Sequence, residues 1–198
     1  GIQLEQLVRL KEPVGAFGRA PHRDGELHLP AADLLLDQEI DERIASRYAK
    51  LVERRAAGEP AAYLLGRREF YGRDFGVDER VLIPRPETEL LVEIALAAAL
   101  PATASVLDIG TGSGCIAIAL AVKCPRAQIT AVDVSEAALA VARANAQRHR
   151  VAERIAFSQS DLLSFIVQRP SSFDLVCANL PYIPSDIARA LPVSQHEP

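Results

Sequence analysis

The chain has 198 residues, of which 49% are hydrophobic and 24% charged, a composition typical of a globular protein with one core and a small second domain. Its net charge of −4 lacks the basic excess of nucleic-acid-binding domains, so a nucleic-acid substrate is not expected. The longest apolar run, residues 94–100, is too short to span a bilayer, and the 3 cysteines and 4 histidines lack zinc-site spacing, so we expect a cytoplasmic protein without metal or membrane contact.

The first part of the chain, residues 1–68, has the pattern of a small helical domain. Its clearest predicted helix covers residues 38–57 and ends before Gly58, with one apolar face made by Ile40, Ile44, Tyr48, Leu51 and Val52. Residues 69–84 are predicted to form a linker that contains a β-hairpin over 69–77, with its turn at 72–74.

From Pro86 onward, the pattern becomes one of alternating strands and helices. A helix is predicted over 86–100, because proline suits the first helical position and Glu87 and Glu89 suit the first turn. Strands are then expected at 105–109, 128–132, 154–158 and 173–178, with helices at 113–122, 135–148 and 162–168. This order predicts an α/β domain over 85–198 with a doubly wound, mostly parallel, Rossmann-like sheet and a crevice at the carboxyl ends of its strands.

A glycine-rich loop follows the first of these strands and opens a helix. Its glycine spacing, G-x-G-x-G, matches neither the dinucleotide fingerprint nor a P-loop. An acid before the loop suits a cationic amino group and the helix N-terminus beyond it suits a carboxylate, and a methionine moiety carries both. The alternative is a plain strand-to-helix turn. The candidate cofactor-binding residues here are Asp108, Gly110, Thr111, Gly112, Ser113 and Gly114.

Two acids follow the next two strands. Asp133 can accept both hydroxyls of a ribose, or it can simply precede the helix that Ser135 caps. Asp161 can accept an adenine amino group, or it can cap the helix predicted at 162–168. Asp161 and its neighbour Leu162 are therefore further cofactor-binding candidates.

The segment after the fourth strand, Asn179-Leu180-Pro181-Tyr182, carries the most specific chemistry. An amide nitrogen is a poor nucleophile, because its lone pair is delocalised, and it needs acceptors for both hydrogens. The side-chain oxygen of Asn179 and the carbonyl of Leu180 can supply them. Pro181 stiffens the turn and Tyr182 offers a ring on which a planar group stacks. The catalytic candidates are Asn179, Pro181 and Tyr182. All four residues of the segment are substrate-binding candidates. Asn179 is also a cofactor-binding candidate. The alternative is a plain proline turn.

The residues now described resemble those of the peptide chain release factor glutamine methyltransferases, the HemK/PrmC family. The resemblance rests on Gly58-Glu59-Pro60, on residues 69–72, on the loop at 108–114, on residues 179–182 and above all on the run 81–89, Val-Leu-Ile-Pro-Arg-Pro-Glu-Thr-Glu. It implies a methyltransferase fold, S-adenosylmethionine as cofactor, and N5-methylation of the glutamine in the Gly-Gly-Gln loop of a release factor. It also implies an N-terminal helical domain that helps to hold that protein. Arg85 is a further substrate-binding candidate, and we expect a monomer.

Two departures from the family keep other readings open. Leu180 stands where the family usually has proline, and Asn-Leu-Pro-Tyr is also typical of adenine-N6 RNA dimethyltransferases. The family's sheet has about seven strands, whereas four are predicted here before Pro198, so we expect C-terminal strands to be missing. The alternatives are an adenine-N6 methyltransferase acting on RNA or DNA and an inactive cofactor-binding fragment. The acidic balance and the run 81–89 argue against the first.

Overall fold

The computed structural model describes residues 41–98, 100–161 and 173–180. The chain divides into two compact units, residues 1–44 and 45–198. The predicted helix at 162–168 lies outside the described residues, as do Leu162, Pro181 and Tyr182. None of the helices in the described ranges is long and apolar enough to cross a membrane.

From residue 41 onward, where the structure describes the chain, two helices precede the hairpin. Helix α3 (Glu42–Ala56) has an acid in its first turn and Arg54 and Arg55 in its last, the charge order that the helix dipole favours. Its end before Gly58 agrees with the prediction. The predicted apolar face is only partly covered: Ile44 is 62% exposed and Tyr48 is 66% exposed, whereas Leu51 and Val52 are half-buried. Ile40 lies outside the described residues. The short helix α4 (Ala61–Leu65) ends at Gly66, which has the positive φ of a helix C-terminus.

The hairpin begins earlier than predicted. Strands β1 (Arg67–Phe70) and β2 (Arg73–Gly76) pair antiparallel, and the turn lies at Tyr71 and Gly72. The predicted turn at 72–74 is wrong, because Tyr71 itself has a positive φ of 52°. Two carboxylates favour this conformation: Glu89 accepts from the Tyr71 backbone N–H at 3.0 Å, and Glu93 accepts from its hydroxyl at 2.8 Å.

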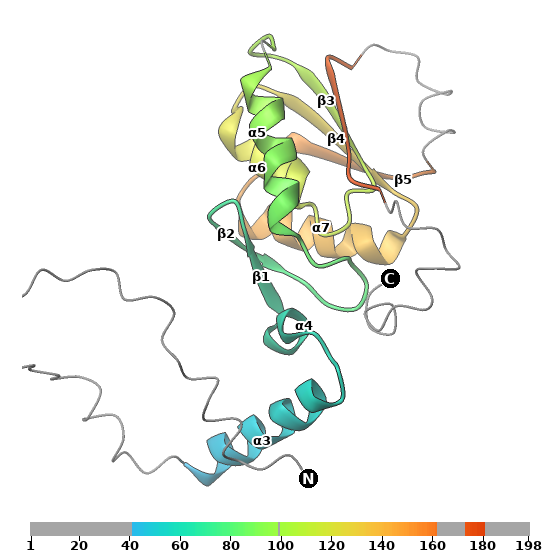
Figure 1. Ribbon diagram of the computed structural model, residues 1–198. Coiled ribbons are helices and arrows are strands. Elements are labelled where there is room, and N and C mark those ends of the chain that lie inside the picture. Colours follow the sequence, from blue (N-terminus) through green and yellow to red (C-terminus); the bar gives the residue numbers. More distant parts are fainter. Residues whose placement is uncertain (1–40, 99, 162–172, 181–198) are drawn as a thin grey trace, which may run out of the picture. The chain divides into compact units, whose positions relative to one another are not determined.

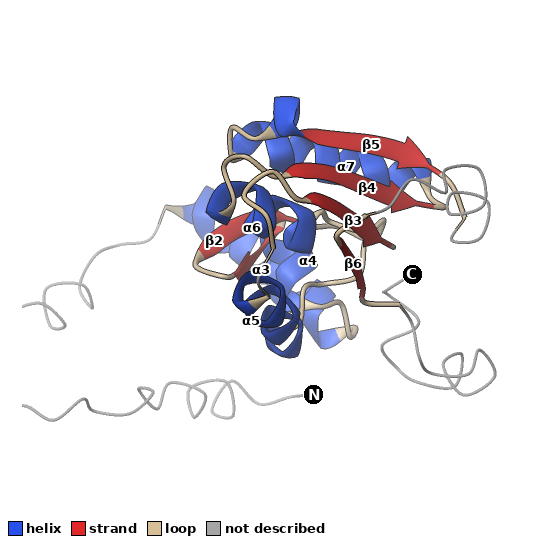
Figure 2. Cartoon of the chain, turned by 90° about the horizontal axis from the view of Figure 1, so that it is seen from above, coloured by secondary structure: helices blue, strands red, loops and turns tan. Residues whose placement is uncertain are grey.

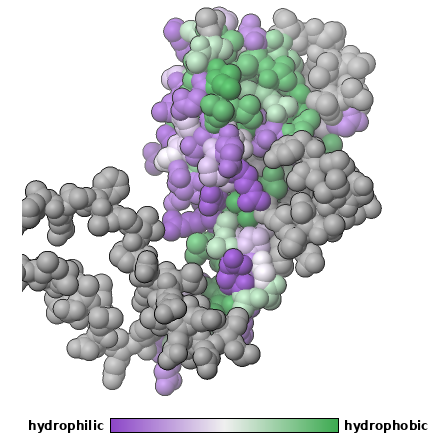
Figure 3. Space-filling view, in the orientation of Figure 1, coloured by the Kyte–Doolittle hydropathy of each residue, from purple (hydrophilic) through white to green (hydrophobic). Residues whose placement is uncertain are grey.

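After the hairpin, the chain enters the sheet domain through a single 3-10 turn. This turn, η2 (Pro86–Thr88), leads directly into α5 (Glu89–Ala97), which ends three residues before the predicted limit. The buried rings of Phe70 and Phe75 pack edge to face at 6.0 Å and join the core that contains Val92 of α5. Hydrophobic side chains gather on the surface over α5, which exposes Leu90 and Ile94 (Figure 3).

Among the described residues, the main sheet has four parallel strands in the order β5-β4-β3-β6 (Figures 1 and 2). Its elements, in chain order, are β3 (Ser105–Ile109), α6 (Cys115–Lys123), β4 (Gln128–Asp133), α7 (Glu136–Arg148), η3 (Ala152–Arg154), β5 (Ile155–Gln159) and β6 (Leu175–Ala178). These bounds confirm the predicted α/β, Rossmann-like, parallel sheet to within two residues at each end. Ser135 caps α7 as predicted, accepting from the Ala138 N–H at 3.2 Å.

The strand order determines where a ligand crevice is expected along the sheet. The chain steps from β3 to β4 to β5 in one direction and then returns to add β6 on the other side of β3. The carboxyl ends of β3 and β6 therefore lie at a switch point, where the loops leaving the two strands diverge and ligands of such sheets bind. The glycine-rich loop leaves β3 at this point, and Asn179 follows β6.

Candidate functional site

The glycine-rich loop depends on a backbone conformation that side chains rarely adopt. Gly110, Gly112 and Gly114 have φ values of +67°, +53° and +81°, in the left-handed region. The loop is tied to the next strand, because the Thr111 N–H donates to the carbonyl of Val132 at 3.0 Å. Thr111 and Ser113 are buried within it. The loop is thus a rigid backbone surface open to close approach by a ligand.

Asp108 lies beneath this loop and is only 1% exposed. Its Oδ2 accepts from the Thr111 hydroxyl at 2.7 Å and from the Ala117 N–H at 3.3 Å, whereas its buried Oδ1 has no hydrogen-bond partner among the described residues. Burial raises the pKa of the Asp108 carboxyl to about 7, against the opposing effect of those two hydrogen bonds. An unpartnered buried carboxylate oxygen suits a cationic group, as expected for the ammonium of the predicted cofactor.

The raised pKa of Asp108 predicts how the stability of the protein depends on pH. This pKa is higher folded than unfolded, so the ligand-free protein should lose stability as pH rises from about 4 to about 7, by at most about 1.4 kcal/mol per pH unit. The stabilisation produced by S-adenosylhomocysteine should grow over the same window, because its ammonium pairs with the ionised form. Melting curves from pH 5 to 8, with and without ligand, test both trends. Asp108→Asn should flatten both, and trends that persist in this variant would assign them to another group.

Asp133 ends β4 beside the loop and has two backbone partners. Its Oδ2 accepts from the Gly112 N–H and its Oδ1 from the Ser135 N–H, both at 2.9 Å. Each carboxylate oxygen has a second lone pair, so these bonds leave capacity for the two hydroxyls of a ribose. The carboxylate thus braces the loop in addition to the ligand role predicted for it. Asp161, two residues past the end of β5, lies at the same edge of the sheet and is exposed.

We expect Asp133→Ala to weaken binding of S-adenosylhomocysteine at least tenfold, since one substitution removes a ribose acceptor and a brace of the loop. Calorimetric titration measures the affinity. The matched control is Ser135→Ala, which removes the α7 cap and should lower stability by about 1 kcal/mol without changing affinity. Unchanged affinity in Asp133→Ala would remove the ribose assignment.

Asn179 stands next to the glycine-rich loop. Ala178 pairs with Ile109 in the β3–β6 register, so the residues that follow, Asn179 and Gly110, leave the sheet side by side. A Cβ added at Gly110 would lie 2.8 Å from Cδ2 of Leu180, which confirms the close approach. Asn179 is half-buried, and its Nδ2 donates to Oγ1 of Thr88 at 3.0 Å. The structure therefore brings the predicted cofactor loop and the predicted amide-holding residue together.

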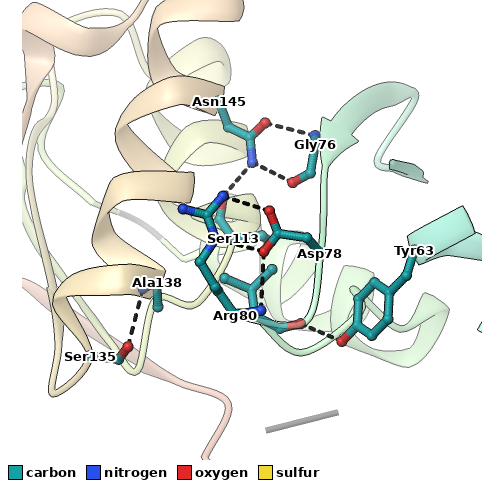
Figure 4. A network of polar contacts seen from close by, with 9 residues as sticks. Tyr63, Gly76, Asp78, Arg80, Ser113, Ser135, Ala138 and Asn145 are labelled. Carbon is teal, nitrogen blue, oxygen red and sulfur yellow. Dashed lines mark hydrogen bonds and ion pairs between the residues drawn. The ribbon is translucent and has the colours of Figure 1, made fainter. Parts of the chain in front are cut away.

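The prediction of site residues missed Thr88 and Asn145. Asn145 is 2% exposed; its side chain accepts from the Gly76 N–H at 2.7 Å and donates to the carbonyls of Gly76 at 3.0 Å and Ser113 at 2.9 Å, so it joins the hairpin to the loop (Figure 4). A lone asparagine among the buried apolar residues of α7 was the available signal. Arg85, the remaining substrate candidate, is exposed in extended backbone ahead of η2.

The cysteines have the properties of core residues. Burial raises the pKa of the Cys115 thiol to about 12 and that of Cys177 to about 11, so neither is a reactive thiolate at neutral pH. Within the described ranges, no group of three or more His, Cys, Asp or Glu residues could hold a metal ion.

Comparison with known proteins gives matches in both parts of the chain. A family model described as the PrmC N-terminal domain matches residues 26–66, and one described as a methyltransferase domain matches residues 106–193. Among curated relatives, the release factor glutamine methyltransferase of Nitratidesulfovibrio vulgaris is 45% identical over 159 residues, covering 79% of this chain and 54% of the relative. That of Koribacter versatilis is 47% identical over 155 residues, covering 78% and 52%. The chain spans about half the length of the curated relatives it matches.

Proposed function

We propose that the chain belongs to the HemK/PrmC family and that it transfers a methyl group from S-adenosylmethionine to the side-chain nitrogen of the glutamine in the Gly-Gly-Gln loop of a peptide chain release factor. The observation that carries the proposal is the position of Asn179. It stands at the end of β6 beside the glycine-rich loop, so an amide held there would lie next to a cofactor held by the loop. The names of the relatives support the substrate.

Each part of the cofactor has a candidate partner in the chain. The unpartnered Oδ1 of Asp108 suits the ammonium, and the backbone of 110–114 at the start of α6 suits the carboxylate. Asp133 is assigned to the ribose hydroxyls, and Asp161 and Leu162 to the adenine. When bound, S-adenosylmethionine supplies an electrophilic methyl group on sulfur.

The chain's own residues position the nucleophile. In the proposed reaction, Oδ1 of Asn179 accepts one hydrogen of the glutamine amide and the Leu180 carbonyl accepts the other, so the nitrogen lone pair points at the methyl group. The amide nitrogen held there would be placed to take the methyl group as that group leaves its sulfur, and the proton that the nitrogen loses as it becomes acidic would pass to water. A strong general base is therefore not needed. In this proposal, Pro181 is assigned to stiffening the turn, Tyr182 to stacking on the planar amide, and Arg85 to contact with the substrate protein.

The proposal extends to the remaining parts of the protein. We assign to residues 1–68 the role of helping to hold the release factor and to residues 85–198 that of the methyltransferase domain; the linker predicted between them, 69–84, contains all but the first two residues of the hairpin. We propose a monomer that works in the cytoplasm. Sedimentation of the purified protein tests the first of these statements, since a concentration-independent dimer would contradict it.

A second candidate function, adenine-N6 methylation of RNA or DNA, is favoured by one observation, the leucine at position 180. Incubation of the purified protein with methyl-labelled cofactor distinguishes the candidates. We expect label in a release factor, none in one whose Gly-Gly-Gln glutamine is replaced by alanine, and none in RNA. Label in RNA would support the second function instead. Cofactor binding without transfer to either acceptor would identify an inactive cofactor-binding fragment.

A further inference from the structure

We infer that Thr88 is a positioning residue for methyl transfer, because its hydroxyl holds the carboxamide of Asn179 in the orientation that the acceptor amide needs. The inference rests on the proposed function and assigns a role to a residue that the sequence analysis did not place in the site. Thr88 lies within the run 81–89, the part of the chain most specific to the family, and it contacts a residue 91 positions further along.

The hydroxyl of Thr88 is not used for capping its own helix. Thr88 directly precedes α5, where a threonine side chain ordinarily accepts from a backbone N–H of the first turn, but no such bond forms. Its Oγ1 instead accepts from Nδ2 of Asn179 at 3.0 Å, and Thr88 is only 6% exposed. A polar oxygen that is buried and directed at a half-buried amide indicates a role at Asn179.

The backbone around Thr88 is held from both sides. Pro86 fixes the start of the 3-10 turn, and the Thr88 N–H donates to the carbonyl of Arg85 at 3.0 Å. On the other side, the Glu89 carboxylate accepts from the Tyr71 N–H, which ties the turn to the hairpin. The Thr88 oxygen therefore has a fixed place from which to orient Asn179.

The orientation matters because the two ends of a carboxamide have opposite hydrogen-bonding character. The oxygen only accepts and the NH₂ group only donates, and a half-turn of the side chain exchanges them. With Nδ2 directed to Thr88, Oδ1 remains for an N–H of the acceptor amide. A reversed side chain would place N–H against N–H and leave the acceptor nitrogen misaligned.

The test compares Thr88→Val, which keeps the shape and removes the hydroxyl, with Thr88→Ser, which keeps the hydroxyl. Under single-turnover conditions, we expect Val to slow transfer to the release factor about tenfold, the effect of one lost hydrogen bond, and Ser to restore it. Cofactor affinity should be unchanged in both. In the Asn179→Ala background, Thr88→Val should cause no further loss, because Thr88 acts through Asn179. Thr130→Val, on β4 and outside the site, is the matched control.

A second readout does not depend on activity. In ligand-free protein, the side-chain amide NMR signals of Asn179 should shift in Thr88→Val and stay in place in Thr130→Val. Normal transfer in Thr88→Val, equal losses in Val and Ser, or a full further loss in the double variant would overturn the inference. If the wild-type protein modifies no release factor, the proposed function is wrong. If the Asn179 signals do not shift in Thr88→Val, the contact between Thr88 and Asn179 is wrong, whatever the activity.

Discussion

Asn179→Ala is expected to remove nearly all methyl transfer, leaving a slow residual rate, while weakening cofactor binding far less. The variant removes the oxygen that holds the acceptor nitrogen in line with the methyl–sulfur bond, and such positioning supplies much of the rate in transfer reactions. Losing one hydrogen bond of this kind in a closed site should raise the barrier by about 3 kcal/mol or more, a loss in rate of at least about a hundredfold.

Two measurements on the Asn179→Ala variant separate catalysis from loop structure. Turnover at saturating release factor reports the transfer step, and titration with S-adenosylhomocysteine reports the cofactor site. Near-normal turnover would contradict the mechanism. An equal collapse of turnover and cofactor binding would show instead that Asn179 shapes the turn beside Gly110, which its position next to β3 also permits.

Among alanine substitutions in the glycine-rich loop, Gly114→Ala is expected to be the most destabilising. Gly114 precedes α6 with φ +81°, and a Cβ there would lie 3.0 Å from Cδ1 of Ile118 and 3.1 Å from Cβ of Ala142, with the Ala142 backbone 3.3 Å away. Left-handed strain should cost about 1–2 kcal/mol and overpacking between α6 and α7 about 1–3 kcal/mol more. Denaturant unfolding measures the sum.

The matched control for this variant is Gly72→Ala. Gly72 has a similar φ of +71°, but a Cβ there would meet nothing within 4 Å. This control should therefore show the strain alone, and the difference between the two variants isolates the packing of α6 against α7. Equal losses of stability in both variants would mean that the helices separate freely and that the loop is not fixed by their contact.

The local pattern of the sequence determined the order of the elements and the backbone conformation of the glycine-rich loop. Alternating apolar runs predicted β3, β4, β5 and β6, and Ser135 predicted the start of α7, because strand periodicity and helix capping depend on residues close together in the chain. Glycine spacing predicted the loop for the same reason, since a left-handed backbone is a local requirement that glycine meets without strain.

The tertiary structure decided the features that join distant segments. The hairpin turn moved to Tyr71, a residue that seldom adopts positive φ, because carboxylates of α5 hold it there. The pairing of Asn145 with Gly76 spans 69 positions, and that of Asn179 with Thr88 spans 91. Such contacts follow from the order in which strands assemble and from the helices packed on them. Patterns among neighbouring residues do not specify the order of strands in a sheet. The sequence therefore predicted a role for Asn179 but not its hydrogen bond to Thr88.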